Sequence, residues 1–149
     1  MKISDAGLSL IRSFEGLSTK AYICPAGVWT IGYGHTAGVK KGQVITEKQA
    51  DELLQQDLIE YENKITNWCK NIKLNQSQFD ALVCFEFNTK GDTLPRSTIF
   101  TCLQAGDIQG AADAFLMWDK ITTKKGNKIS CAGLRRRRTA ERRLFLSKL

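Results

Sequence analysis

The stretch FEGLSTKAYICPAGVWTIGYGHT, from Phe14 to Thr36, changes from a helical to a strand-like pattern at a single glycine. Upstream, apolar residues three or four positions apart predict a helix that Ser4 caps. Gly16 is typical of a helix C-terminus, so Glu15 should be the last helical residue. Downstream, the segments AYI, VWTIGYGH and QVI are rich in β-branched and aromatic residues. They predict a small antiparallel sheet.

Glu15 is the strongest catalytic candidate, because its expected position disfavours a negative charge. The C-terminal end of a helix carries partial negative charge, and the adjacent apolar face partly removes the carboxyl group from water. Both effects favour the protonated form, which is the form that a general acid uses. The alternative interpretation is an exposed glutamate at a helix end.

Cys24 and Thr30 follow Glu15 in a predicted hairpin, where a turn residue and a strand residue could both face the helix end. Cys24 could be a nucleophile with His35, the only histidine, as its base. It could equally be an unreactive turn cysteine. Asp57 lies on the apolar stripe of the next predicted helix, and a carboxylate there needs a partner. We therefore predict a structural His35–Asp57 pair that ties the sheet to that helix.

The rest of the chain is predicted to be helical. Capping boxes that begin at Thr46 and Asn75 mark a long helix and a further one. Asp107 is expected to cap the IQGAADAFLMW helix, and the last helix should begin near Ala132. The sequence thus predicts an α+β protein that is mainly α-helical, with one small antiparallel sheet.

The length of 149 residues suits a single domain over 1–149. We expect a helix and sheet lobe over about 1–45, a connecting helix from about 46, and a helical lobe up to 149. The five cysteines include no CxxC pair, and with one histidine they predict neither a disulfide scaffold nor a metal or cofactor site. The sequence shows no signal peptide and no membrane-spanning segment.

The net charge of +7 favours a polyanionic partner, which could be nucleic acid, an anionic cell wall or a membrane surface. Much of this charge lies in the tail GLRRRRTAERRLFLSKL. On a helix, Arg137 and Glu141 share the inner face and can pair, and Arg138 lies at its edge. We predict that Arg137 and Arg138 orient an internal carboxylate or a substrate. Because Phe145 is the only aromatic residue of the tail, nucleic acid is not the expected partner.

Together these motifs resemble those of the phage-type lysozymes, the endolysins. The resemblance includes the TIGYGHT block at its spacing after EG, the segment ITEKQADELLQQDL, the FN…ST pattern that starts at Phe87 and Asn88, and the closing GL..RR.AER. It extends in order over nearly the whole chain. It implies a lysozyme-like α+β fold with a cleft between the sheet lobe and the helical lobe.

The resemblance also implies hydrolysis of the β-1,4 bond between N-acetylmuramic acid and N-acetylglucosamine in bacterial peptidoglycan, which lyses the host cell. In this family an acid begins the EG motif, a threonine helps to hold the attacking water, two residues line the cleft, and two arginines are paired. The matching residues are Glu15 as general acid, Thr30 beside the water, Phe87 and Asn88 as the cleft wall, Arg137 and Arg138 as the paired arginines, and His35 with Asp57 as a structural pair.

Cys24 departs from the family, in which Asp is commonest at this position. An inverting glycosidase ordinarily uses a second carboxylate, ~6.5–9.5 Å from the first, to activate water. Cys24 could orient or activate water beside Thr30 as a thiolate, attack the sugar, or contribute little; we favour the first. Glu86 is a rival second carboxylate, although a core or cleft-wall position is favoured. Lys90 occupies a glycine-favoured place in FNTKG, which affects the local loop and sugar contacts.

Two other functions are compatible with the sequence. One is a catalytically inactive module that binds peptidoglycan or nucleic acid, and the other is a cysteine hydrolase that uses Cys24 and His35. For the favoured endolysin we expect a monomer that binds peptidoglycan, has no cofactor and does not insert stably into membranes. It would be made in the bacterial cytoplasm and reach the wall through a membrane lesion made by a separate phage protein.

Overall fold

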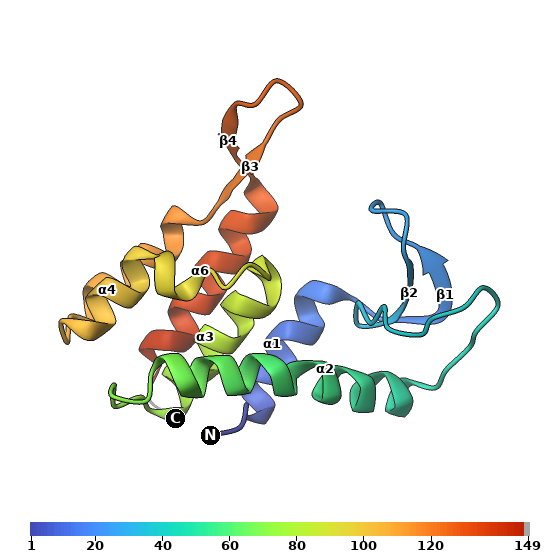
Figure 1. Ribbon diagram of the computed structural model, residues 1–149, viewed down its shortest axis with the longest axis horizontal. Coiled ribbons are helices and arrows are strands. Elements are labelled where there is room, and N and C mark those ends of the chain that lie inside the picture. Colours follow the sequence, from blue (N-terminus) through green and yellow to red (C-terminus); the bar gives the residue numbers. More distant parts are fainter. Residues whose placement is uncertain (148–149) are drawn as a thin grey trace.

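The computed structural model describes residues 1–147 and shows a sheet lobe and a helical lobe at opposite ends of one long helix (Figure 1). The helices are α1 (Asp5–Glu15), α2 (Glu47–Trp68), α3 (Gln76–Thr89), α4 (Thr98–Gln104), α5 (Ile108–Ala114) and α6 (Ala132–Leu146), with short 3-10 turns η1 (Leu94–Arg96) and η2 (Phe115–Met117). The strands are β1 (Ser18–Ile23), β2 (Trp29–Gly32), β3 (Lys120–Thr122) and β4 (Lys128–Ser130). The predicted α+β, mainly helical class is confirmed.

Helix α1 ends at Glu15, as predicted, and Gly16 adopts a positive φ of 71° that a larger residue would resist. Ser4 occupies the N-cap position, but its side chain forms no cap hydrogen bond. The hydroxyl of Ser4 instead donates to the carboxylate of Asp80 in α3, and its backbone N–H donates to the same group at 3.0 Å. Ser4 is therefore the N-cap residue, as predicted, but its side chain is oriented toward a buried carboxylate of another helix and does not bond the first turn of α1.

Strands β1 and β2 form an antiparallel pair in which Tyr22 lies opposite Thr30. The segment QVI was expected to add a third strand. Val44 forms an isolated antiparallel bridge with Lys20, and Gln43 and Ile45 each share a backbone hydrogen bond of 2.9 Å with β1. The segment thus pairs with the sheet as expected, but over too few residues to form a full strand.

Both predicted capping boxes are present, at Thr46 for α2 and at Asn75 for α3. Helix α3 lies at the centre of the helical lobe and packs against α1, α2 and α6. Every residue from Ser77 to Phe87 is buried, so this helix has no solvent-facing side. Its carboxylates must therefore find partners inside the protein.

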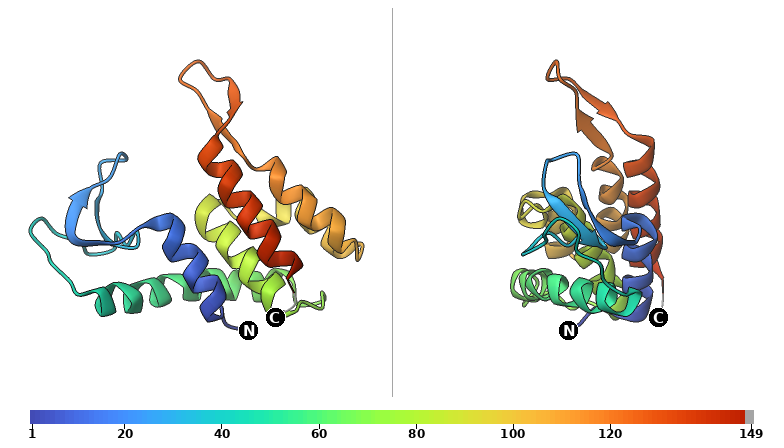
Figure 2. Two further views of the ribbon diagram at one scale, coloured as in Figure 1. Left: turned by 180° about the vertical axis from the view of Figure 1, so that it is seen from behind. Right: turned by 90° about the vertical axis from the view of Figure 1, so that its right-hand side faces the viewer.

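The segment from Ile108 to Trp118 forms two elements instead of one helix, because α5 ends at Ala114 and continues as the 3-10 turn η2. A hairpin of β3 and β4 follows, which the sequence analysis did not predict. It projects beyond the end of α6, away from the packed helices (Figures 1 and 2). Among the described residues, none of the helices has the length and apolar content needed to cross a bilayer.

Candidate functional site

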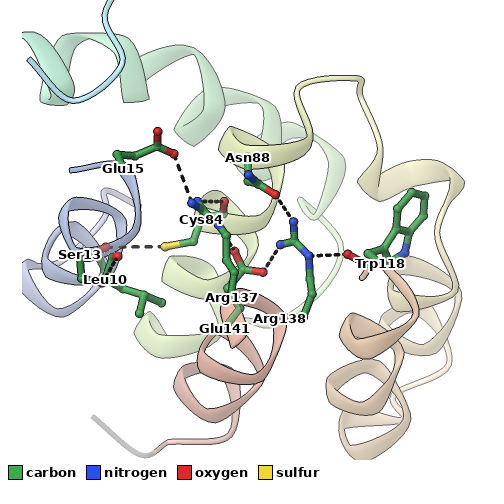
Figure 3. A network of polar contacts seen from close by, with 10 residues as sticks. Leu10, Ser13, Glu15, Cys84, Asn88, Trp118, Arg137, Arg138 and Glu141 are labelled. Carbon is green, nitrogen blue, oxygen red and sulfur yellow. Dashed lines mark hydrogen bonds and ion pairs between the residues drawn. The ribbon is translucent and has the colours of Figure 1, made fainter. Parts of the chain in front are cut away.

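Glu15 is held at the end of α1 by an arginine from the last helix. Its Oε1 atom lies 3.2 Å from Nη1 of Arg137, although the two residues are 122 positions apart in the sequence. Arg137 is itself fixed, because its Nη2 atom donates to the carbonyl oxygen of Cys84 and its Nε atom donates to Glu141 (Figure 3). The candidate acid therefore faces a guanidinium group that the core holds in place, which restricts where its carboxyl group can lie.

The other side of the Glu15 carboxyl group faces the backbone of Gly34. A Cβ atom at this glycine would lie 3.4 Å from Oε2 of Glu15, and its φ of 84° is one that residues with side chains rarely adopt. Ile31 and His35 exchange two backbone hydrogen bonds of 2.9 Å across this turn. The IGYGH segment thus forms a tight turn against the candidate acid. Sequence reasoning did not select Gly34, although a glycine in so tight a motif was a usable signal.

Cys24 and Thr30 lie together near the turn that joins β1 to β2. The backbone N–H of Cys24 donates to the carbonyl oxygen of Val28 at 3.0 Å, and Thr30 is almost completely buried. Hydrogen bonding from the backbone of Val28, then from the hydroxyl of Thr30, lowers the pKa of the Cys24 thiol from its ordinary value. The Thr30 hydroxyl also donates to the Val28 carbonyl oxygen at 3.0 Å, so this oxygen and the sulfur compete for one proton.

This environment predicts that Cys24 is the most reactive thiol of the chain. All five cysteines are free, but burial raises the pKa of Cys69 to about 11 and raises that of Cys84 as well. A lowered pKa means that the Cys24 thiolate forms at lower pH than an ordinary thiolate. Iodoacetamide alkylation followed by mass spectrometry from pH 6 to 10 should show Cys24 reacting first, with a midpoint below that of a free thiol. Equal rates at Cys24 and Cys69 would contradict the assignment.

His35 contacts Asp57 in α2, where the sequence analysis expected a pair. The Nδ1 atom of His35 lies 2.8 Å from Oδ2 of Asp57, and Nε2 lies 2.9 Å from the carbonyl oxygen of Ala37. Both ring nitrogens are therefore engaged, and neither is directed to Cys24 by a hydrogen bond. This geometry disfavours a cysteine hydrolase, because the base of such an enzyme must reach its nucleophile.

A cleft pocket of about 180 Å³ opens between the two lobes. One wall is the loop from Gly34 to Ala37, and the others come from α2, including Tyr61, and from α3. Phe87 meets Tyr61 edge to face, with ring centroids 5.3 Å apart. Lys90 adopts the left-handed conformation at the end of α3, and its Nζ atom lies 4.2 Å from the Phe87 ring centroid. Lys90 thus lines the cleft and also caps the C-terminal end of α3.

Arg138 was expected at the edge of the inner face of α6, but its side chain is fully inside the protein and the residue is 1% exposed. It donates to the side chain of Asn88, to Glu141, and to the carbonyl oxygen of Trp118 at 2.9 Å (Figure 3). The 3.6-residue period gives directions on an isolated helix, whereas α3 and η2 cover both sides of α6. Arg138 therefore orients Asn88 instead of presenting its own charge to a substrate.

Glu86 is fully buried, and its two oxygens accept the backbone N–H groups of Thr93 and Leu94 at 3.2 and 2.9 Å. It fixes the start of η1 and lies away from the cleft surface, which agrees with the favoured core position. Within residues 1–147, no three His, Cys, Asp or Glu side chains gather in a way that could bind a metal ion.

Comparisons with known proteins find relatives of the chain in both sequence and structure. The family model described as "Phage lysozyme" matches residues 12–141. An endolysin of Acyrthosiphon pisum secondary endosymbiont phage 1 is 40% identical over 99% of both chains. An endolysin of Bacillus phage B103 is 45% identical, but this chain spans only 55% of its length. A SAR-endolysin of Haemophilus phage HP1 is 33% identical over 97% of this chain and 81% of the relative.

Among solved structures, the muramidase domain of SpmX from Asticaccaulis excentricus matches with a TM-score of 0.91 and 40% identity over 99% of both chains. The lysozyme-like fold therefore extends over the whole described chain, including the hairpin that the sequence analysis did not predict.

Proposed function

Because the chain belongs to the phage lysozyme family and is of endolysin type, we propose that it is an N-acetylmuramidase. It hydrolyses the β-1,4 bond between N-acetylmuramic acid and N-acetylglucosamine in bacterial peptidoglycan. The observation that carries this proposal is the position of Glu15, between the Gly34 backbone and the Arg137 guanidinium, beside the turn that lines the cleft.

Glu15 acts as the general acid and protonates the glycosidic oxygen as the bond breaks. The fixed Arg137 limits the carboxyl group to positions from which it can reach a sugar in the cleft. On protonation of the leaving group, Glu15 becomes an anion, and Arg137 at 3.2 Å stabilises that anion. The glycan strand lies along Phe87, with Asn88 held in position by Arg138.

Cys24 and Thr30 bind and orient the attacking water. The lowered pKa of Cys24 supports a thiolate that accepts a hydrogen bond from water, and Thr30 lies beside it on the paired strand. The two residues come from one hairpin, whereas Glu15 comes from the helix before it. The arrangement thus supplies an acid from one element and a water-binding pair from another, and an inverting glycosidase uses both an acid and a group that activates water.

The test is the chemistry of the products released from purified peptidoglycan. A muramidase generates new reducing ends without new amines, and we expect this result. New free amines would show peptide-bond cleavage and support the cysteine hydrolase that uses Cys24. Binding without either product would support an inactive peptidoglycan-binding module.

We further propose that the chain acts as a single lysozyme domain and as a monomer, with lysis of the host cell as its outcome. It is made in the bacterial cytoplasm and reaches the wall through a lesion formed by another phage protein. The positive charge of the chain, +7, suits an anionic wall.

A further inference from the structure

A second hollow lies apart from the cleft, beneath the β3–β4 hairpin. This groove has a volume of about 450 Å³, and its walls are the hairpin on one side and the start of α4 with Arg96 on the other. Met117 and Trp118 lie between them. It shares no lining residue with the cleft pocket described above. The proposed hydrolysis assigns it no role.

The register of the hairpin gives its two faces different chemistry. Ile121 pairs with Ile129, and Thr122 pairs with Lys128. Because side chains alternate across a strand, Lys120, Thr122 and Lys128 share one face and the two isoleucines share the other. The face with the lysines lines the groove. The fold therefore directs two of the lysines of the hairpin into the hollow.

The groove carries a surplus of positive charge from both walls. Arg96 faces it from one side, Lys120 and Lys128 face it from the other, and none of the described residues that line it is acidic. Lys120 is partly neutralised, because its Nζ atom lies 3.1 Å from Asp119, which also binds Arg135. Among the ion pairs of residues 1–147, none engages Lys128 or Arg96. Nη2 of Arg96 donates to the carbonyl oxygen of Gly91 at 3.1 Å, so the other N–H groups of Arg96 and the Lys128 ammonium are the donors that can receive an anion.

We propose that this groove binds a phosphate-bearing polymer of the bacterial wall, in which phosphodiester groups alternate with short carbon units. A phosphodiester directs its two free oxygens away from each other around a tetrahedral phosphorus. Arg96 and Lys128 on opposite walls can each meet one of these oxygens, or bind successive phosphates of the polymer, and both side chains are common phosphate ligands. Met117, which is largely exposed, and Trp118 provide apolar contact for the carbon units.

This inference rests on the proposed function only in taking the wall as the place of action. Binding of the polymer needs no hydrolysis, so it is measured in a Glu15→Gln background in which the wall stays intact. Cleavage of peptidoglycan that lacks phosphate polymers tests the proposed function separately. A failure of one measurement therefore leaves the other interpretable.

The experiment compares two variants with the same loss of charge. Arg96→Gln with Lys128→Gln removes one cation from each wall of the groove, and Lys124→Gln with Lys125→Gln removes two from the hairpin turn, outside the groove. Binding to soluble poly(glycerol phosphate) is measured by calorimetry at two salt concentrations. We expect the groove variant to bind roughly tenfold more weakly than the parent, with a smaller salt dependence, and the turn variant to bind nearly as well as the parent.

Walls of a Gram-positive bacterium provide the second arm, before and after hydrofluoric acid removes their phosphodiester polymers. The parent should sediment more strongly with untreated walls, and the groove variant should lose this difference while still cleaving the stripped walls at the normal rate. If both variants lost the same amount of binding, net charge alone would explain the loss, and the proposal would be overturned. A groove effect that persists on stripped walls, or on poly-L-glutamate of matched charge, would overturn it in favour of a carboxylate ligand.

Discussion

Replacing Glu15 with Gln is expected to lower peptidoglycan hydrolysis by about 10²–10⁴-fold, the range over which a general acid contributes to catalysis. The glutamine side chain has nearly the same shape but has no acidic proton to donate. It leaves the Gly34 backbone uncrowded and can still accept a hydrogen bond from Arg137. The loss should therefore appear in kcat, with little change in KM or in the urea midpoint of unfolding.

The rate is measured as reducing ends released from purified peptidoglycan. Glu47→Gln, an exposed glutamate at the start of α2, is the matched control and should retain full activity. Cys24→Asp should also remain active, because it restores a carboxylate beside Thr30. A Glu15→Gln enzyme with the activity of the Glu47→Gln control would exclude Glu15 as the acid.

Much of this site follows from local sequence signals. Gly16 marks the end of α1, so the place of Glu15 can be predicted without any tertiary contact. The caps at Thr46 and Asn75 depend on hydrogen bonds to residues three positions away, which is why both are confirmed. Arg137 contacts Glu141, four positions on, as the helical periodicity predicted. Its second carboxylate partner, Glu15, is 122 positions distant, and no periodicity identifies it.

The features that the sequence did not reveal depend on packing between distant elements. Arg138 is buried in α6, against which α3 and η2 both pack. The side chain of Ser4, the N-cap residue of α1, donates to Asp80 of α3 and forms no cap hydrogen bond. Each strand of the β3–β4 hairpin has three residues, too few for an alternating pattern to stand out. Its one local signal was the Gly126-Asn127 turn between them.

The same buried network gives the largest expected effect on stability. Glu141 is fully buried and contacts both Arg137 and Arg138 (Figure 3). Glu141→Gln would leave two buried guanidinium groups without their shared counter-charge. Breaking a buried ion pair in this way costs about 3–5 kcal/mol. The loss should appear as a lower midpoint in urea unfolding with an unchanged slope.

Two opposing effects decide where in that range the value lies. Burial raises the pKa of Glu141, with Arg138 and then Arg137 opposing the shift, so the charged carboxylate is itself costly to bury. Glutamine removes that cost and offsets part of the loss, which favours the lower end, about 3 kcal/mol. The penalty still dominates, because among residues 1–147 Arg137 would retain only Glu15 as an acidic partner and Arg138 would retain none.

Asp113→Asn provides the matched control, because Asp113 of α5 forms an exposed ion pair with Arg142 of α6. Solvent screens this pair, so its loss should change the unfolding midpoint far less than the loss of Glu141. If the two variants unfolded at the same urea concentration, the arginine pair would be stable without Glu141. The position of Arg137 against Glu15 would then depend on the Cys84 carbonyl oxygen and the surrounding packing, and Glu141→Gln would also leave kcat unchanged.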